Sequence, residues 1–163
     1  SYTCGGLFPY LGRNYRLQVS IGKENSIKLR RGIFNIIIQE KEKNNDQIEK
    51  KILFKWYIEK ARILLIKRTY NLCKKIGVKP ESIVIKDYKS KWGSCSIKGD
   101  IHYNWRIIMA PRKIIDYLVV HELCHLLEYN HSRRFWWHVF KNYPYTKESR
   151  IWLKKYGNEL MEL

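Results

Sequence analysis

The chain has 163 residues, of which 45% are hydrophobic and 14% aromatic, so its composition predicts a folded protein rather than a disordered one. Lys and Arg outnumber Asp and Glu by 32 to 15, which gives a formal net charge of +17. No apolar run approaches the roughly 18–20 residues that span a bilayer, and the first residues lack the basic cluster and apolar core of a signal peptide. We therefore expect a single domain over residues 1–163 that does not enter a membrane.

The first 45 residues predict a β meander. Short β-prone stretches at Tyr15–Val19, Ser26–Leu29 and Ile33–Gln39 are separated by turns at Gly22 and at Arg31–Gly32. Short connections of this kind favour antiparallel pairing of consecutive strands.

A long amphipathic helix is expected next. From about Gln47 to Ile76 the apolar residues recur at spacings of three, four and seven. Asp46 is suited to be its N-cap, and Gly77 followed by Pro80 is typical of a helix end.

Two strands and a tight loop follow this helix in the prediction. The strands are expected at Ile83–Asp87 and Ile101–Asn104, and the loop at Lys91–Ser96. In the loop, Gly93 is expected to make a turn and Trp92 to pack under the helix that contains His121.

Three further helices are predicted in the last third of the chain. Pro111 is expected as the first residue of a helix that runs to about Glu128. Ser132 is expected to cap the next helix, which Pro144 ends, and the last helix should begin at about Lys147. The order strands, helix, strands, helices predicts an α+β fold.

The clearest chemical signal is the sequence His121-Glu122-Leu123-Cys124-His125 inside a predicted helix. Two histidines four residues apart lie on one helical face, where both imidazoles can reach a single zinc ion. Glu122 is rotated by about 100° from His121, so it is poorly placed as a ligand but can reach a water on the metal. Zinc lowers the pKa of such a water toward ~7, and the carboxylate then accepts its proton. This is the HExxH pattern of metalloproteases.

A catalytic zinc needs a third protein ligand, and His131 is the favoured one. If the helix continued past His125, His131 would lie about 240° around the axis, so the chain must turn between Glu128 and His131. Asn130 tolerates the left-handed conformation that such a turn can require. Glu128, on the same helical stripe as the two histidines, and Glu148 remain alternative ligands.

The motif and its surroundings resemble a known family, the YgjP-like metallopeptidases, which are relatives of the SprT/Spartan and WLM zincins. The resemblance is dense from about Lys55 to Leu153 and lies in these stretches: Lys91-Trp92-Gly93-Ser94-Cys95-Ser96, Ile101-His102-Tyr103-Asn104-Trp105-Arg106, Ala110-Pro111, His121-Glu122-Leu123-Cys124-His125, Asn130-His131-Ser132 and Phe135-Trp136. The family usually has Arg where Lys91 stands, and its members commonly carry a longer N-terminal β region.

The resemblance implies a minimal zincin-like fold, in which a small antiparallel or mixed sheet packs on the long helix and on the HExxH helix. Residues 46–163 would then be the catalytic core. His121, His125 and His131 would hold zinc, Glu122 would be the general base, and the substrate would be a protein or peptide. In such a fold we expect the strand Ile101–Asn104 to be the edge on which an extended peptide docks. Tyr103 or a tyrosine nearer the C-terminus is a candidate to polarise the oxyanion.

Other functions stay open at this point. Zinc endoribonucleases that mature bacterial ribosomal RNA carry three histidines at the same spacing, but they have Gly where this chain has Glu122, which favours the peptidase. A protease that acts on DNA-bound proteins is a further alternative. Cys95 as a second nucleophile is disfavoured, because nothing in the sequence places a His–Asn pair beside it.

The cysteines indicate the compartment. Cys4, Cys73, Cys95 and Cys124 are scattered, without a CxxC pair, as is typical of reduced thiols in a cytoplasmic protein. We therefore expect a cytoplasmic location and no zinc site built from cysteines.

The positive charge is concentrated in the first half of the chain. Residues 1–80 hold 18 Lys and Arg against 6 Asp and Glu, whereas residues 81–163 hold 14 against 9. Such a field can attract a polyanion, so non-specific binding of DNA or RNA is a hypothesis beside the simpler one of composition bias. The candidate residues are Arg30, Arg31, Lys50, Lys51, Lys55, Arg62, Lys67, Arg68, Lys74 and Lys75.

Overall fold

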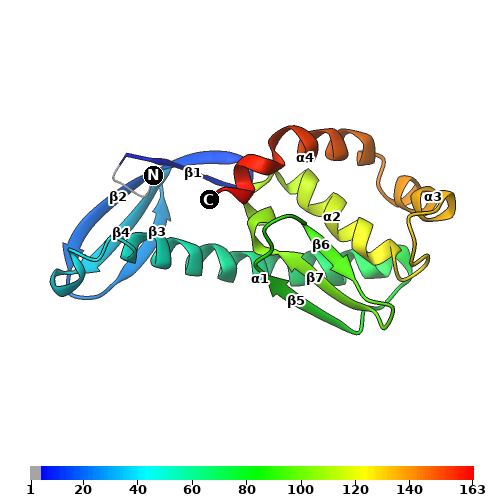
Figure 1. Ribbon diagram of the computed structural model, residues 1–163, viewed down its shortest axis with the longest axis horizontal. Coiled ribbons are helices and arrows are strands. Elements are labelled where there is room, and N and C mark those ends of the chain that lie inside the picture. The colour runs from blue at the N-terminus through cyan, green and yellow to red at the C-terminus, as the bar shows by residue number, and fades with distance from the viewer. Residues whose placement is uncertain (1–4) are drawn as a thin grey trace.

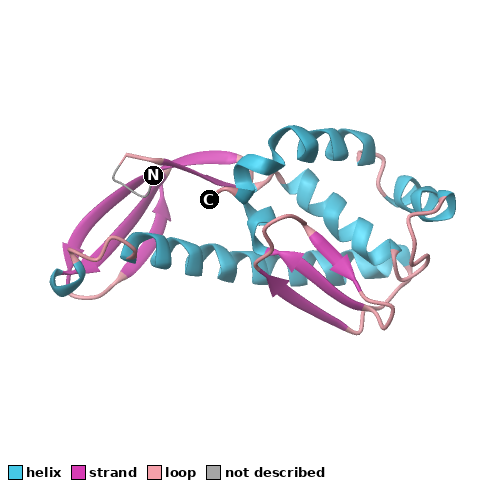
Figure 2. Cartoon of the chain, in the orientation of Figure 1, coloured by secondary structure: helices cyan, strands magenta, loops and turns pink. Residues whose placement is uncertain are grey.

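The computed structural model describes residues 5–163, so Cys4 lies outside the described part of the chain. A long helix, α1 (Ile48–Ile76), runs along the molecule between two small sheets, one near each of its ends (Figures 1 and 2). Three more helices pack beside the second sheet: α2 (Arg112–Cys124), α3 (Arg133–Asn142) and α4 (Thr146–Met161). The α+β class expected from the sequence is confirmed.

The N-terminal sheet has four strands in the order β1-β2-β4-β3: β1 (Leu7–Tyr10), β2 (Arg13–Gly22), β3 (Ser26–Arg30) and β4 (Ile33–Gln39). A short 3₁₀ helix, η1 (Glu40–Glu42), follows. The β1–β2 and β3–β4 pairs are antiparallel, but β2 and β4 are parallel. The predicted antiparallel meander is therefore wrong in its pairing, and β1 was missed.

The reason for this pairing lies in the burial of the strands. β4 carries Phe34, Ile36 and Ile38 on one fully or nearly buried face. β3 carries exposed Lys28 and Arg30, which suit an edge. The most apolar strand therefore takes the inner position next to β2, although β3 precedes it in the chain.

The long helix begins and ends nearly as predicted. Its N-cap is Gln47 without a side-chain hydrogen bond, so Asp46 is not the cap. At the other end Gly77 adopts a left-handed conformation (φ 82°) and donates its N–H to the carbonyl of Cys73, which confirms the predicted stop. Leu53, Tyr57, Ala61 and Leu65, four residues apart, are fully buried.

The second sheet has the order β5-β7-β6, with β5 (Ser82–Lys86), β6 (Gly93–Cys95) and β7 (Asp100–Asn104). The stretch expected to be only a loop thus contains a strand. Gly93–Cys95 has little intrinsic β propensity, and its antiparallel pairing with β7 makes it one. β7 is the central strand, so the prediction that it forms a free edge is wrong.

The last helices place the HExxH segment beside this sheet. A 3₁₀ helix, η2 (Trp105–Met109), leads into α2. Pro111 is the N-cap of α2, so the helix begins at Arg112, one residue later than expected. α2 ends at Cys124 rather than near Glu128, because Leu126 and Leu127 bond to carbonyls three residues back in a tighter turn. Ser132 caps α3 by accepting a hydrogen bond from the N–H of Phe135, as predicted.

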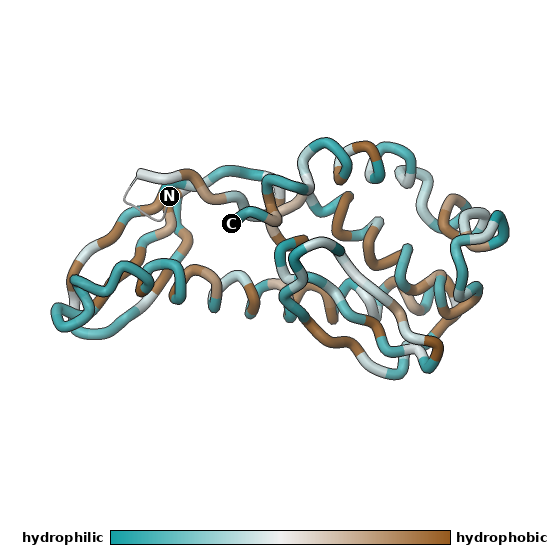
Figure 3. Tube along the Cα trace, viewed as in Figure 1, coloured by the Kyte–Doolittle hydropathy of each residue, from teal (hydrophilic) through white to brown (hydrophobic). Residues whose placement is uncertain are grey.

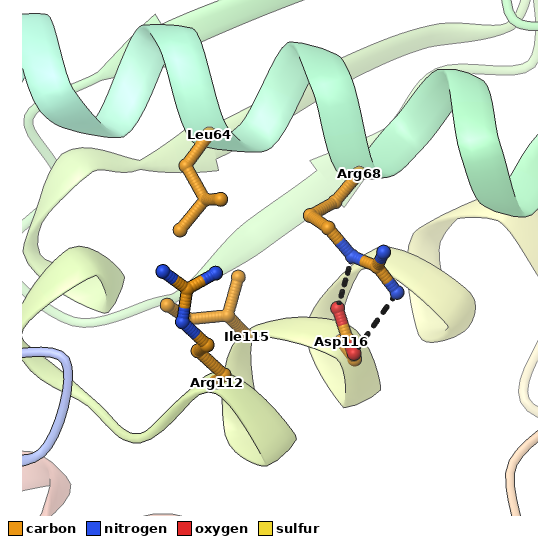
Figure 4. Close-up of a pocket in the computed structure, with 5 residues that line it drawn as sticks. All are labelled: Leu64, Arg68, Arg112, Ile115 and Asp116. Atoms are coloured by element: carbon orange, nitrogen blue, oxygen red, sulfur yellow. Dashed lines mark hydrogen bonds and ion pairs between the residues drawn. The ribbon is translucent and has the colours of Figure 1, made fainter.

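One hydrophobic core extends through both ends of the molecule. The ring centroid of Phe34 in the first sheet lies 6.1 Å from that of Tyr57 in α1. The Tyr57 ring in turn stacks on Trp105 of η2, with centroids 5.7 Å apart. Figure 3 shows hydrophobic segments along α2 and along the strands of both sheets. Arg68 of α1 also forms an ion pair with Asp116 of α2 at 2.8 Å (Figure 4). Among the helices of residues 5–163, none is long and apolar enough to cross a membrane.

Candidate metal centre

Three imidazoles converge where α2 ends. His121 lies in the last turn of α2, His125 follows its last residue, and His131 lies just before α3. The Nε2 atom of His131 is 3.2 Å from that of His125 and 3.3 Å from that of His121. Two nitrogens bound to one tetrahedral zinc at about 2.0–2.1 Å would lie about 3.3–3.4 Å apart. The three side chains therefore fit a single zinc ion.

This cluster contains no carboxylate. Within residues 5–163, the three histidines are the one group of three or more potential ligand side chains, with all ligand atoms within 4.8 Å of one another. Neither Glu128 nor Glu148 belongs to it, although Glu128 lay on the expected helical stripe. The stripe is interrupted because α2 ends four residues before Glu128.

The turn that brings His131 back is built differently from the prediction. The chain does turn between Glu128 and His131, but Asn130 is not among the residues with positive φ. Instead, the Asn130 side-chain oxygen accepts a hydrogen bond from the N–H of Ser132, which fixes the entry into α3.

Hydrogen bonds on the outer side of the imidazoles orient two of them. His125 Nδ1 lies 3.1 Å from the backbone oxygen of Glu128, an atom that can only accept, so this nitrogen carries the proton and the Nε2 lone pair faces the cluster. His121 Nδ1 lies 3.1 Å from the hydroxyl of Tyr117. Sequence reasoning missed Tyr117, although its position four residues before His121 on a helix was a usable signal.

Aromatic side chains of α3 surround the cluster. The ring of Phe135, which is fully buried, stacks on His125 with centroids 4.2 Å apart and meets His121 edge-on at 5.0 Å. The ring of Trp136 also contacts His121 edge-on, with centroids 5.5 Å apart. These contacts hold the rings in place without using their nitrogens.

Burial favours the neutral form of His121 and His125. It lowers the pKa of His121 to about 3, with further lowering from the charges of His125, His131 and Arg150. The pKa of His125 is lowered as well, chiefly by burial. A neutral imidazole is the form that binds a metal ion.

Glu122 lies beside the cluster, under strand β6. Its side chain is buried, with 4% of the residue exposed, and burial raises its pKa to about 8, against a smaller opposing effect of Lys91. Lys91 thus places a positive charge near this carboxyl.

Gly93 is needed for this close approach. A Cβ atom at position 93 would lie 2.8 Å from Oε2 of Glu122 and 2.9 Å from the carbonyl oxygen of His102. Any side chain would therefore displace the carboxylate or the strand. Sequence reasoning had assigned Gly93 only to a turn.

The cluster opens into a cavity of about 330 Å³. It is lined by Gly93, Ser94, Cys95, His121, Glu122, His125, Tyr129 and His131. A second cavity of about 610 Å³ shares His125 and Tyr129 with the first. Strand β6, one of the two edge strands of its sheet, therefore forms one wall of the site.

Three other residues of this region differ from the prediction or refine it. Tyr103 is fully buried and its hydroxyl lies 2.9 Å from that of Thr69, so it cannot reach an oxyanion in the cavity. The ring of Trp92 lies close to Gly157 of α4, where a Cβ atom would be 3.3 Å from it. The pKa of Cys95 is raised to about 11, first by burial and then by Glu122, so its thiol stays protonated and is a poor nucleophile.

One comparison with known proteins identifies a family. A family model described as YgjP-like, metallopeptidase domain, matches residues 1–156. A comparison with curated proteins found no match. Among solved structures, the metallopeptidase zymogen abylysin of Pyrococcus abyssi is 26% identical, with a TM-score of 0.49 over 55% of this chain and 93% of that one. The zymogen jannalysin of Methanocaldococcus jannaschii is 20% identical, with a TM-score of 0.48 over 56% of this chain and 94% of that one.

Proposed function

Since the chain belongs to the YgjP-like metallopeptidase family, we propose that it hydrolyses peptide bonds with a zinc ion held by His121, His125 and His131. The observation that carries this proposal is the convergence of three Nε2 atoms, 3.2 and 3.3 Å apart in two of the pairs, beside a buried carboxyl. Three neutral nitrogen ligands leave one position of a tetrahedral zinc open for substrate or water, as a catalytic site requires.

Glu122 is the proposed general base. It accepts the proton of the attacking water and passes it to the departing amine. Burial raises the pKa of this carboxyl above its ordinary value, which makes it a stronger base toward the water proton than an exposed carboxylate. Zinc, when bound, supplies a Lewis acid that polarises the scissile carbonyl and makes water acidic.

The substrate is proposed to bind as an extended strand on β6. This strand is the sheet edge that lines the cavity, and its neighbour β7 is already paired on both sides. Addition of a peptide strand to a free edge uses main-chain hydrogen bonds, so it accepts many sequences.

Removal of the metal tests the proposal. The purified chain should contain about one zinc per molecule and degrade an unfolded protein such as casein. A chelator should abolish cleavage, and added Zn²⁺ should restore it, because the ligand set binds a single ion. Proteolysis that persists in a metal-free protein, as measured by gel and metal analysis together, would refute the function.

An observation on the N-terminal half supports a second proposal, the association with DNA or RNA. Residues 1–80 hold 18 Lys and Arg against 6 Asp and Glu, an excess that can attract a polyanion. Lys51, Lys55 and Trp56 line a cavity of about 460 Å³ between α1 and β3, which Glu42 and Glu59 line as well. Arg68, one of the ten candidates, is paired with Asp116 and is less available. The endoribonuclease alternative is not favoured, because Glu122 supplies the base that a peptidase needs.

Salt dependence measures this association. Binding of a random-sequence duplex should weaken steeply between about 50 and 200 mM salt, because phosphate contacts release counterions. The double variant Lys51→Gln, Lys55→Gln should lower the slope of log K against log salt by up to about 1.8 and leave the zinc content unchanged. A dissociation constant above about 100 μM at 50 mM salt would leave composition bias as the explanation.

The continuous core from Phe34 through Tyr57 to Trp105 supports the further proposal that residues 1–163 form one domain. In it, the first 45 residues extend the catalytic core of residues 46–163 rather than forming a separate unit.

A further inference from the structure

Arg150 of α4 stacks on Trp136 of α3, whose ring contacts the metal centre at His121. The guanidinium carbon of Arg150 lies 4.1 Å from the centroid of the Trp136 ring. The same ring lies 5.5 Å from the ring of His121. These two separations place the guanidinium no more than 9.6 Å from the His121 imidazole.

The charge of Arg150 has no carboxylate partner within residues 5–163. The ion pairs of this part of the chain join Lys43 with Glu40, Arg68 with Asp116, and Arg106 with Asp87. Arg150 is exposed, so its charge is open to a ligand from solvent. Stacking on Trp136 occupies the face of the guanidinium and leaves N–H groups at its edge able to donate.

Other cations lie near the metal centre. Lys79 and Lys98 line the cavity of about 610 Å³ that adjoins His125, where Glu81 is the acidic residue. Lys91 lies close enough to act on the pKa of Glu122. A positive field inside a cleft concentrates negatively charged substrates and disfavours positively charged ones.

We infer that Arg150, held by Trp136, binds the side-chain carboxylate of an Asp or Glu residue next to the scissile bond of the substrate. This inference rests on the proposed peptidase function and names its substrate class. Consecutive residues of an extended peptide are about 3.4 Å apart, so the carboxylate of a neighbouring residue can reach a group within 9.6 Å of His121. The planar guanidinium matches a carboxylate with two parallel hydrogen bonds, and its stacked position reduces the entropy lost on binding.

Matched peptides test the inference in the zinc-loaded full chain. Internally quenched peptides blocked at both ends are compared, with Glu or Gln at each position beside the cleaved bond. For one of these positions the parent should cleave the Glu peptide with a kcat/KM about tenfold or more above that of its Gln partner. Arg150→Gln should abolish this preference, and Arg150→Lys should restore part of it, since a lysine offers charge without the planar fork.

Arg16→Gln is the matched control, because it removes the same charge from an exposed position on β2, in the other sheet. It should keep the Glu preference of the parent. Equal slowing of the Glu and Gln peptides by Arg150→Gln would overturn the inference, because a purely structural loss does not distinguish them. A preference seen only for peptides with a free C-terminal carboxylate would also overturn it, since the ligand would then be the chain terminus.

The inference and the function on which it rests fail in different ways. If no peptide is cleaved in a zinc-dependent manner, the peptidase function is refuted. If cleavage depends on zinc but the Glu and Gln peptides react at the same rate in the parent, only the role of Arg150 is refuted.

Discussion

Glu122→Gln should keep zinc and the fold but lower the rate of peptide hydrolysis by about 10²- to 10⁴-fold, the usual contribution of a general base. The amide has nearly the same shape as the carboxyl but cannot accept the proton of the attacking water. The measurement is kcat for a quenched peptide at saturating substrate, together with metal analysis of the same preparation. A variant that cleaves as fast as the parent would remove Glu122 from the mechanism.

Stability of the metal-free protein provides the control for this variant. The folded-state pKa of Glu122 is about 8, above the ordinary 4.5, because burial disfavours the carboxylate. Ionisation of the buried carboxyl lowers the free energy of unfolding. This destabilisation is absent below pH 4.5, grows as pH rises from 4.5 to 8, and is constant above 8. Metal-free Glu122→Gln lacks this ionisation. Its free energy of unfolding in urea should therefore equal that of the parent at pH 4.5 and exceed it at pH 8. A less stable variant at pH 8 would mean that any loss of activity reflects damage to the site.

His131→Ala should weaken zinc binding by more than about 100-fold, whereas Glu128→Ala and Glu148→Ala should leave it nearly unchanged. The loss of a direct ligand exceeds the 10- to 100-fold effect that is usual for residues outside the ligand set. Glu128 contacts His125 through its backbone oxygen, which the alanine variant keeps. Competition with a chromogenic chelator measures all three affinities.

A double variant provides the control for these three affinities. The double variant His121→Ala, His125→Ala should bind no zinc at this site, because one remaining imidazole cannot hold the ion tightly. Full zinc stoichiometry in that variant would refute the site assignment. If Glu148→Ala is the variant that loses the metal, the ligand set is two histidines and a carboxylate instead.

What the sequence determined by itself about this protein is local in the chain. The relation of His121, Glu122 and His125 follows from the 100° rotation of a helix, and the need for a turn before His131 follows from the same geometry. The stop at Gly77 and the cap at Ser132 are likewise signals within a few residues, and both are confirmed. Such features require no knowledge of what packs against the segment.

The tertiary structure decided everything that depends on contacts between distant segments. An alternating apolar pattern fits parallel and antiparallel neighbours alike, so the pairing of β2 with β4 and the central place of β7 were not available from it. The approach of Gly93 to Glu122 depends on β6 packing against α2. Arg150 and Trp136 lie 14 residues apart in the chain and meet because α3 and α4 both pack on α2. Side chains come together in this way only when hydrophobic faces from separate elements are buried on one another, and a local sequence pattern does not encode which faces those are.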